Sequence, residues 1–309
     1  MRPSLSVVVL TRNEAAHVRE ALASLLAQSD PVDEIVVVDA ASDDATCALV
    51  REAAERDSRV RLIDSPRILA VGEARNLGVA ASKGECVAFM SADAVADPSF
   101  AARVRASLRG ADLVFGRQVH APLRLTLAAA VRGLRYHLYE RKLPAEAYAS
   151  NVVSAARREL LERFPFGASE ADSVLDDVLL ARRAREAGLV LAYDPTMVVH
   201  HRDKATLASE YRKVRREARA WGATRRETGG LDRVVGWGAL VLVALGGAVS
   251  YPHTITLALL ALVLAAPALR RVTPGAFARY RGWALAAIAA SPAYDLAFLF
   301  HYIQGAMSR

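Results

Sequence analysis

The chain of 309 residues is long enough for one large domain with an appendage, and its 53% hydrophobic content is high for a soluble enzyme. Two cysteines exclude a disulfide framework, and the first apolar run, Leu5–Leu10, is too short for a secretory signal. The net charge of +7 is concentrated between Arg212 and Arg233. This basic segment has few aromatic residues and adjoins apolar ones, so we expect it to bind an anionic membrane surface and no nucleic acid.

The first hundred residues alternate between short apolar runs and helical patterns. Four runs predict strands: Ser6–Leu10, Glu34–Asp39, Val60–Ile63 and Cys86–Met90. Three segments between them predict helices: Asn13–Gln28, Ser42–Arg56 with Ser42 or Asp43 as N-cap, and Gly72–Ser82. This βαβ alternation with short links predicts an α/β fold with a mostly parallel sheet and helices on both faces.

Beyond Asp97 the pattern is less regular. Helices are expected at Ser99–Leu108, Leu123–Arg141, Ser150–Phe164 and Asp176–Ala187. Short strands are expected at Leu113–Phe115, Val190–Tyr193 and Met197–Val199, and the last of these leads directly to His200 and His201.

Three long apolar segments occupy the end of the chain. Val234–Tyr251 and Thr254–Leu269 contain no charged residue, and Trp283–Tyr302 contains one acid, Asp295. Because about 20 apolar residues cross a bilayer, these segments predict two or three transmembrane helices. The alternative is a buried helical hairpin in a soluble domain.

The predicted organisation therefore has three parts: a catalytic domain at 1–204, a basic amphipathic interface helix or linker at 205–233, and a membrane domain at 234–309. Arginines precede the first apolar segment and follow the second, which places both flanks on the cytoplasmic side by the positive-inside rule. We expect a multi-pass protein of the cell membrane whose catalytic domain is cytoplasmic.

Three of the four predicted strands in the first hundred residues end in polar side chains. They are followed by Thr11-Arg12-Asn13-Glu14, by Asp39 and by Ser91-Ala92-Asp93. The carboxyl edge of an open α/β sheet is where ligands bind, so we expect these residues to line one crevice. Neither a G-x-G-x-x-G nor a G-x-x-x-x-G-K-[ST] sequence is present, which disfavours a dinucleotide site and a P-loop.

Four stretches together resemble a family 2 glycosyltransferase with the GT-A fold. In chain order they read SVVVLTRNEAAHVREALASLLAQ, EIVVVDAASDDAT, GEARNLGVAASKGECVAFMSADAVADP and DDVLLARRAREAG, and the similarity covers residues 4–203. The resemblance implies a nucleotide-diphospho-sugar transferase. Its apolar tail is similar to that of members acting on lipid-linked saccharides or growing surface polysaccharides.

The resemblance also implies roles for particular residues. Those implied to lie at the nucleotide and sugar donor are Thr11, Asn13, Glu14, Asp39, Arg75, Asn76, Ala92 and Asp93. Asp39 would bind the base or the ribose, and Asp93 matches the last acid of the D-x-D metal motif. Asp177 matches the second acid of the E-D pair, the general base. His201, with His200 as the alternative, matches a histidine that faces the metal or the pyrophosphate.

This sequence departs from the family pattern at three positions. Ser91 stands where the first D-x-D acid is usual, Ala40 replaces a second acid after Asp39, and Asp176 stands where glutamate is common. A hydroxyl is a weaker ligand for Mg²⁺ or Mn²⁺ than a carboxylate. Ser91 therefore leaves three alternatives open: Asp93 and a histidine hold the ion with water, metal binding is weaker than usual, or the protein is a catalytically inactive relative.

We therefore expect an inverting glycosyltransferase that takes a sugar from a UDP- or GDP-sugar with Mg²⁺ or Mn²⁺. The expected acceptor is a lipid-linked saccharide or nascent polysaccharide near the membrane. One alternative is a polyprenyl-phosphate glycosyltransferase, whose phosphate acceptor needs no strong base. A second is a non-catalytic membrane scaffold that binds a nucleotide sugar.

Overall fold

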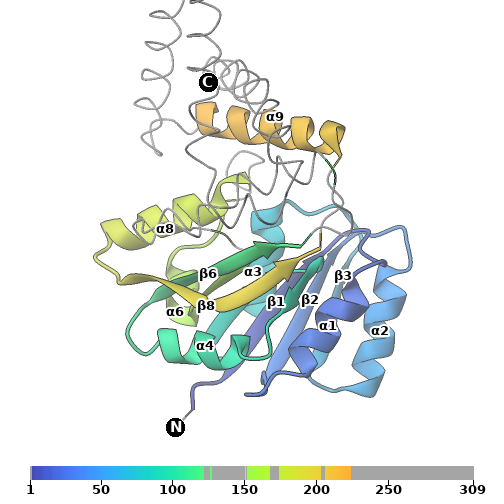
Figure 1. Ribbon diagram of the computed structural model, residues 1–309, viewed down its shortest axis with the longest axis horizontal. Helices are drawn as coiled ribbons and strands as arrows, with labels where there is room; N and C mark the ends of the chain where they lie inside the picture. The colour runs from blue at the N-terminus through green and yellow to red at the C-terminus, as the bar shows by residue number, and fades with distance from the viewer. Residues whose placement is uncertain are drawn as a thin grey trace, which may run out of the picture. The chain divides into compact units, whose positions relative to one another are not determined.

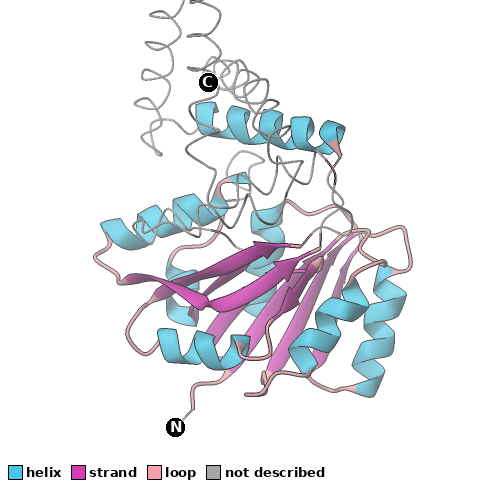
Figure 2. Cartoon of the chain, in the orientation of Figure 1, coloured by secondary structure: helices cyan, strands magenta, loops and turns pink. Residues whose placement is uncertain are grey.

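The computed structural model describes residues 2–121, 126, 150, 152–167, 174–202 and 206–223. The chain divides into two compact units, one formed by 1–121 and 142–203 and the other by 122–141 and 204–309. The first unit is an α/β domain built on a twisted sheet (Figures 1 and 2). The sequence predicts only some of the strands that follow Asp97 in this unit.

Four parallel strands form one half of the sheet. They are β1 (Leu5–Thr11), β2 (Glu34–Ala40), β3 (Val60–Ser65) and β4 (Cys86–Ser91). They lie in the order β3-β2-β1-β4. The middle strands are buried on both faces, which explains why the sequence shows continuous β-branched runs there instead of an alternating pattern. This half agrees with the prediction.

The other half of the sheet is mixed. The complete order is β3-β2-β1-β4-β7-β6-β8-β5, with β5 (Ala94–Ala96), β6 (Leu113–His120), β7 (Val153–Arg157) and β8 (Leu191–His201). β7 runs antiparallel to both β4 and β6, and β5 runs antiparallel to β8. The expectation of a mostly parallel sheet therefore holds only for the first half. In the second half, β7 is an antiparallel strand in a segment that was predicted as part of a helix.

Helices cover both faces of this sheet, as predicted. They are α1 (Val18–Leu26), α2 (Thr46–Arg56), α3 (Val71–Ala81), α4 (Phe100–Ser107), α6 (Arg158–Arg163) and α8 (Asp176–Glu186). Val7 and Val9 belong to the core cluster that contains residues of α1 and α4. Val8, between them, faces Gly78 of α3 on the opposite side. Successive side chains of β1 therefore pack against different helices.

Two helices begin later than the sequence indicated. α1 begins at Val18, and residues 14–17 form a turn in which the N–H groups of His17 and Val18 donate to the Glu14 carbonyl. α2 begins at Thr46 and not at Ser42. The predicted N-cap, Ser42, instead donates its hydroxyl to Asp39. The residues released from the two helices form loops at the carboxyl ends of β1 and β2.

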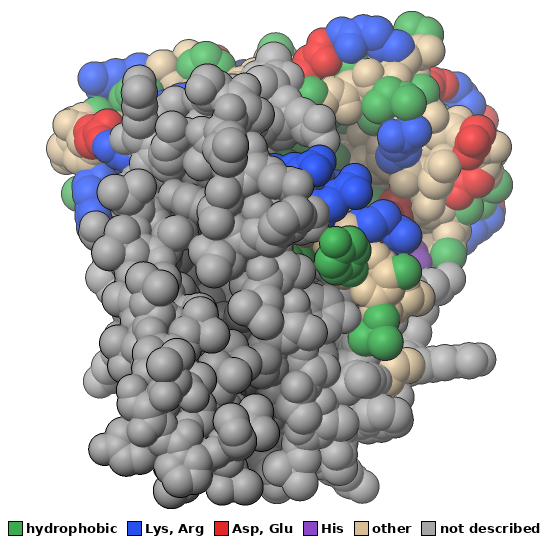
Figure 3. Space-filling view, turned by 90° about the horizontal axis from the view of Figure 1, so that it is seen from above, with side chains coloured by type: hydrophobic (Ala, Val, Ile, Leu, Met, Phe, Trp, Pro, Cys, Tyr) green, Lys and Arg blue, Asp and Glu red, His purple; other side chains and the backbone are tan. Residues whose placement is uncertain are grey.

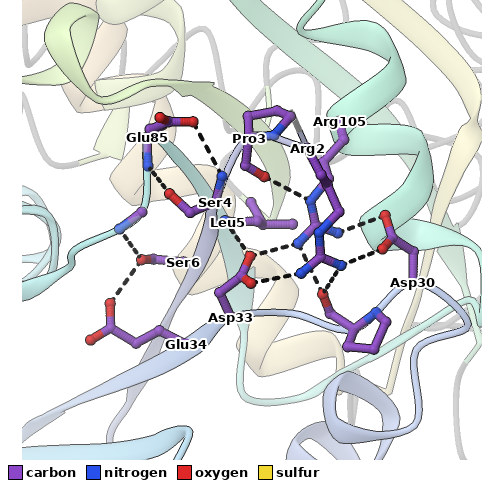
Figure 4. A network of polar contacts seen from close by, with 12 residues as sticks. Arg2, Pro3, Ser4, Leu5, Ser6, Asp30, Asp33, Glu34, Glu85 and Arg105 are labelled. Carbon is purple, nitrogen blue, oxygen red and sulfur yellow. Dashed lines mark hydrogen bonds and ion pairs between the residues drawn. The ribbon is translucent and has the colours of Figure 1, made fainter.

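An arginine clamp closes the opposite, amino-terminal edge of the sheet (Figure 4). Arg105 of α4 is only 3% exposed, and its guanidinium reaches Asp30 and Asp33 at 2.7 Å each. Asp33 also accepts the N–H of Leu5 at 2.8 Å, and Arg2 pairs with the same two acids from the outside. The clamp therefore joins α4, the start of β1 and the loop before β2.

The second unit contributes one described helix, α9 (Leu207–Ala223), which lies within the segment predicted to be a basic amphipathic helix. Its Val214 and Ala218 are buried, while Arg212, Arg215 and Arg219 are exposed. Figure 3 shows Lys and Arg side chains beside hydrophobic ones on the face seen from above.

Among the described residues, no helix combines the length and the apolar character that a bilayer crossing requires. The predicted membrane segments Val234–Tyr251, Thr254–Leu269 and Trp283–Tyr302 lie outside the described residues.

Candidate functional site

The carboxyl ends of three strands meet at one edge of the sheet, as the sequence predicted. Thr11 at the end of β1 is level with Asp39 of β2, and Leu10 is level with Ser91 of β4. The predicted site residues fall into three groups on this framework. One surrounds Asp39, the second surrounds Asp93, and the third surrounds Arg75 and the start of α8.

Asp39 is fully buried and held by several donors. Thr11 donates its hydroxyl at 2.7 Å, and Ser42 donates both its N–H at 2.8 Å and its hydroxyl at 2.5 Å. Burial favours the protonated form, but the hydrogen bonds from Ser42, Thr11 and Cys47 outweigh it and hold the pKa of Asp39 below its ordinary value. Asp39 is therefore an ionised acceptor with a fixed orientation.

The loops after β1 and β2 are joined to each other by side chains. The Asn13 N–H donates to the Ser42 hydroxyl at 2.8 Å, and the Asp43 N–H donates to the Asn13 side-chain oxygen at 3.0 Å. The Glu14 N–H donates to the Thr46 hydroxyl at 2.8 Å. These bonds fix the shape of the two loops that carry Asn13 and Glu14, both predicted to lie at the nucleotide.

Both loops contain one residue with left-handed backbone. Asn13 has a φ of 57° and Ala41 a φ of 58°. Asparagine tolerates this conformation, whereas in alanine the Cβ clashes with the backbone. Strain of this kind is typical of ligand clamps, where the surrounding structure imposes the conformation.

Asp93 lies in the turn between β4 and β5 and pairs with His201 at the end of β8. The Asp93 Oδ1 lies 3.2 Å from the His201 Nε2, and Ser91 donates its hydroxyl to the same carboxylate. Burial raises the pKa of Asp93, but His201 and Ser91 outweigh burial and lower it to about 2. Asp93 is thus ionised at any physiological pH.

The two histidines of β8 face different acids. Ala94 is level with His201 and Val95 with His200, so their side chains leave the strand on opposite sides. His201 contacts Asp93, whereas the charge of His200 acts on Asp97. Of the two alternatives, His201 is therefore the histidine beside the predicted metal ligand. Asp97 accepts the N–H of Ser99 at 3.0 Å, which fits a turn-forming role.

A further acid, Glu14, senses the charge of Asp93. Burial and the negative charge of Asp93 raise the pKa of Glu14, and its carboxylate lies 3.0 Å from the Nδ1 of His17. The Asp93 carboxylate and the His201 imidazole are an oxygen and a nitrogen ligand of the kind that fits a divalent cation such as Mn²⁺, with water completing the coordination. Ser91 is committed to Asp93 and adds only a neutral oxygen.

The third group lies at the start of α8, where the predicted base Asp177 is half-buried. The preceding residue, Asp176, is buried and forms an ion pair with Arg75 of α3. The Arg75 guanidinium lies 6.0 Å from the ring centre of Phe89 and 5.5 Å from that of Phe166. Burial lowers the pKa of Arg75 to about 10, so it remains a cation.

Asn76, next to Arg75, forms two reciprocal hydrogen bonds with the backbone of Phe166, each 2.9 Å long. The described contacts of Arg75 and Asn76 are thus with protein groups, and their predicted place beside the nucleotide stays a prediction. Ala92 is fully buried in the turn before Asp93. It adds no polar side-chain group to the site.

Cys47 has a role that no sequence pattern indicated. Its sulfur and carboxylate oxygens of Asp39 and Asp64 lie within 4.8 Å of one another. Burial and the neighbouring Asp39 raise the pKa of Cys47 to about 12, so the thiol stays protonated and donates to Asp39. It acts here as a hydrogen-bond donor, since a metal requires the thiolate.

A parallel sheet edge that gathers ionised acids from neighbouring strands, with a histidine at the same edge, is typical of transferases that bind phosphorylated donors. The chain matches the glycosyl transferase family 2 model over residues 6–164. It belongs to this family and is a glycosyltransferase.

Two curated relatives are named for the biosynthesis of succinoglycan and of O-antigen. The succinoglycan biosynthesis protein ExoO of Rhizobium meliloti (strain 1021) is 41% identical over 110 residues, covering 36% of this chain and 30% of that protein. The O-antigen biosynthesis protein RfbC of Myxococcus xanthus is 36% identical over 105 residues, covering 33% of this chain and 8% of that protein. The match thus spans less than a third of either relative.

Two solved structures have the same fold. The mannosyltransferase PcManGT from Pyrobaculum calidifontis, solved with GDP-Man and Mn²⁺, has a TM-score of 0.62 at 21% identity and covers 100% of this chain and 88% of its own. The glucosyl-3-phosphoglycerate synthase from Mycobacterium tuberculosis, solved with Mn²⁺, UDP-Glc and phosphoglyceric acid, has a TM-score of 0.53 at 24% identity and covers 74% and 80%. Both likenesses show the GT-A fold of the domain.

Proposed function

We propose that this protein is an inverting glycosyltransferase that moves a sugar from a UDP- or GDP-sugar to a membrane-proximal hydroxyl acceptor. The observation that carries the proposal is the placement of ionised Asp39 and Asp93 at the carboxyl ends of β2 and β4, the two strands that flank β1, with His201 beside Asp93. Structural neighbours solved with GDP-Man or UDP-Glc support this class of donor.

Asp39 would bind the nucleoside. Its carboxylate is oriented by Thr11 and Ser42, and an N–H of the base or a ribose hydroxyl would take the place of one of the donors that surround it. The rigid loops carrying Asn13 and Glu14 would border the same nucleoside, because side-chain hydrogen bonds fix their shape before the ligand arrives.

Asp93 and His201 would hold a divalent cation, and the Mn²⁺ present in both structural neighbours supports this assignment. Such a cation supplies charge stabilisation for the diphosphate as it leaves. Because the set includes a softer nitrogen ligand and lacks a second D-x-D carboxylate, we expect Mn²⁺ to support activity better than Mg²⁺.

Asp177 would act as the general base. Its carboxylate takes the proton of the acceptor hydroxyl, and the oxygen attacks the anomeric carbon. The bond from that carbon to the diphosphate oxygen breaks, and the nucleoside diphosphate leaves with the electron pair. One displacement inverts the anomeric centre. A positioned base contributes about 10²–10⁴-fold to such a step.

The acceptor we propose is a lipid-linked saccharide or a nascent polysaccharide at the cytoplasmic face of the cell membrane. The polysaccharide-related names of the curated relatives support it, as do the apolar segments between Val234 and Tyr302. Fractionation of cells producing the full chain tests the location. Recovery in the fraction that resists carbonate extraction is expected, and release by carbonate would contradict membrane insertion.

The donor site is tested with a panel of UDP- and GDP-sugars in the presence of Mn²⁺ or Mg²⁺, scored by donor hydrolysis and by thermal stabilisation. At least one of the two donor classes is expected to be hydrolysed by the protein and to raise its melting temperature. If no member of the panel stabilises the protein while metal is present, the donor-site assignment is wrong.

Asp177→Asn separates the alternatives. It is expected to lower transfer to a hydroxyl acceptor about 10²–10⁴-fold while leaving UDP or GDP affinity unchanged. A polyprenyl-phosphate glycosyltransferase would retain most of its activity in this variant, because a phosphate acceptor is already ionised. The scaffold alternative, suggested by Ser91, requires nucleotide binding without transfer of any sugar by the unaltered protein.

A further inference from the structure

Among the described residues near the proposed site, Arg75 is a deeply enclosed cation. Its side chain is 11% exposed, and its partner Asp176 is 4% exposed. A buried charge is tolerated only when a partner and hydrogen bonds compensate for the water it has lost. The Arg75–Asp176 pair therefore fixes α3 relative to α8. The charge of Arg75 is already compensated by Asp176 within the protein.

The guanidinium is also held by two aromatic rings. Phe89 of β4 and Phe166, which follows α6, lie 6.0 and 5.5 Å away, and the two rings meet edge to face at 5.4 Å. Asn76 fastens the backbone of Phe166 to α3 through two hydrogen bonds. These contacts keep Arg75 in one place, since the planar cation is favoured over aromatic faces.

Asp176 connects this cation to the proposed base. One carboxylate oxygen of Asp176 pairs with Arg75, and the other accepts the backbone N–H of Asp177 at 2.8 Å. The Asp177 carboxylate in turn accepts the N–H of Val178 at 2.8 Å. The first turn of α8 is thus fixed through Asp176 to a cation that belongs to α3.

We propose that Arg75 is a positioning residue for Asp177, acting through Asp176, and that it does not bind the nucleotide. This inference rests on the proposed function, because it assumes that Asp177 is the base. It changes the role that the resemblance implied for Arg75. It also gives Asp176 a function of its own, as the link between the fixed cation and the reacting carboxylate.

The test uses the full chain and four variants: Arg75→Gln, Arg75→Lys, Asp176→Asn and the double variant Arg75→Gln/Asp176→Asn. Arg67→Gln is the matched control, because Arg67 forms an exposed ion pair with Glu73 at the start of the same helix. Three quantities are measured for each protein: the affinity for UDP and GDP with Mn²⁺ by calorimetry, the kcat for hydrolysis of UDP-glucose or GDP-mannose, and the urea midpoint of unfolding.

Arg75→Gln and Asp176→Asn are each expected to lower kcat about 10²-fold, since small misplacements of a catalytic group have effects of this size. Nucleotide affinity should stay within about twofold, because neither side chain touches the nucleotide. The double variant should lose no more than the worse single variant, which is the signature of two residues acting as one unit. Arg75→Lys keeps the charge without the planar stacking and should recover part of kcat.

Several outcomes would overturn the inference. A tenfold or greater loss of UDP or GDP affinity in Arg75→Gln, with Asp176→Asn unaffected, would make Arg75 a nucleotide ligand. Additive losses of kcat would show that the two residues act separately, and an unchanged kcat per folded molecule would show a purely structural pair.

Failure of the proposed function is recognised separately. In that case the unaltered protein binds neither nucleotide and hydrolyses neither donor, so the result does not depend on any variant. The inference then falls with the proposed function, because there is no base to position.

Discussion

Asp39 has its environment prepared before any ligand arrives. Thr11 and Ser42 give it hydrogen bonds of 2.7, 2.8 and 2.5 Å, and the Cys47 thiol adds a further donor. A buried carboxylate without such donors would take up a proton and lose its value as an acceptor. The donors therefore decide the charge state of Asp39, and its position at the strand end decides only where that charge lies.

Replacement of Ala41 by glycine should stabilise the protein. Ala41 has a φ of 58°, a conformation that costs an alanine about 1 kcal/mol and a glycine much less. We expect Ala41→Gly to raise the free energy of unfolding by about 0.5–1 kcal/mol, measured by urea denaturation.

Ala48→Gly is the control, because Ala48 is exposed within α2 and glycine there should cost about 1 kcal/mol. The same substitution should thus raise the free energy of unfolding at Ala41 and lower it at Ala48. Destabilisation by Ala41→Gly would contradict the inference of strain.

Restoring the missing acid should strengthen metal binding. Ser91→Asp places a second carboxylate beside Asp93, and affinity for a hard cation rises with the number of charged ligands. We expect Mn²⁺ affinity to increase about tenfold, measured by the free Mn²⁺ signal in electron paramagnetic resonance. Ser91→Ala serves as the control for loss of the hydroxyl, and equal affinity in both variants would place the cation elsewhere.

For individual residues, the sequence predicted where the site lies more successfully than which side chains contact one another there. The strand ends predicted Thr11, Asp39 and Asp93 at one edge, and the structure confirms that the strand ends carrying them adjoin. It named His201 but kept His200 as an alternative, because a shift of one residue reverses the side of the strand. It also missed Cys47, since the contact with Asp39 depends on where α2 begins.

Among the elements, α3 packs closely against the sheet at Gly78. A Cβ at Gly78 would lie 2.4 Å from the Cγ1 of Val8, which is fully buried in β1. Glycine thus allows the backbone of α3 to approach the strand that ends in Thr11. The same helix carries Arg75, so its distance from the sheet also places the cation that pairs with Asp176.

Gly78→Ala should therefore be destabilising. The added methyl group has no room beside the stiff valine, and such overpacking costs about 1–3 kcal/mol. Gly110→Ala is the matched control, because a Cβ there meets nothing within 4 Å and the change should stay within about 0.5 kcal/mol. Equal urea midpoints for the two variants would contradict the close packing of α3.

Strands with a continuous buried apolar run were easier to predict from the sequence than strands with an irregular pattern. The buried runs of β1 to β4 were predicted with bounds close to those observed, because a short continuous apolar run bounded by turn residues is typical of a buried strand. β7 was missed within an expected helix, since VSAAR alternates too briefly to show a period. β8 was predicted as two strands because Pro195 interrupts its pattern, and the register shift beside Gly116 accommodates the irregularity.

In the first unit as a whole, one edge of the sheet carries the proposed site and the opposite edge carries ion pairs that stabilise the fold. The proposed site occupies the carboxyl edge, and the arginine clamp occupies the amino edge (Figure 4). The buried Arg105 compensates two acids there, whereas Arg2 meets the same acids from a position that is 45% exposed. Stability and binding therefore depend on different polar groups.

Arg105→Met should destabilise the protein by about 2–3 kcal/mol at pH 7, because it leaves the acids without their buried cation. Burial raises the pKa of Asp33, but the Leu5 N–H and Arg105 outweigh it and lower the pKa below the ordinary value. Ionised Asp33 therefore stabilises the fold above about pH 4, and this contribution is lost as the pH falls through its folded pKa.

The difference in the free energy of unfolding between Arg105→Met and the unaltered protein should accordingly become smaller below about pH 4. Urea unfolding measured across the pH range checks this. Arg2→Met is the control and should destabilise the protein much less than Arg105→Met, because exposed ion pairs contribute little. A difference that does not change with pH would show that packing, and not charge, accounts for the effect of Arg105.

The hydrogen bonds between the loops after β1 and β2 limit how this protein can be recombined with its relatives. Asn13 and Glu14 each depend on a hydroxyl from the other loop, supplied by Ser42 and Thr46. A chimera that imports only one loop would separate donors from their acceptors. Crossovers intended to change donor preference should therefore transfer residues 11–47 as a single block.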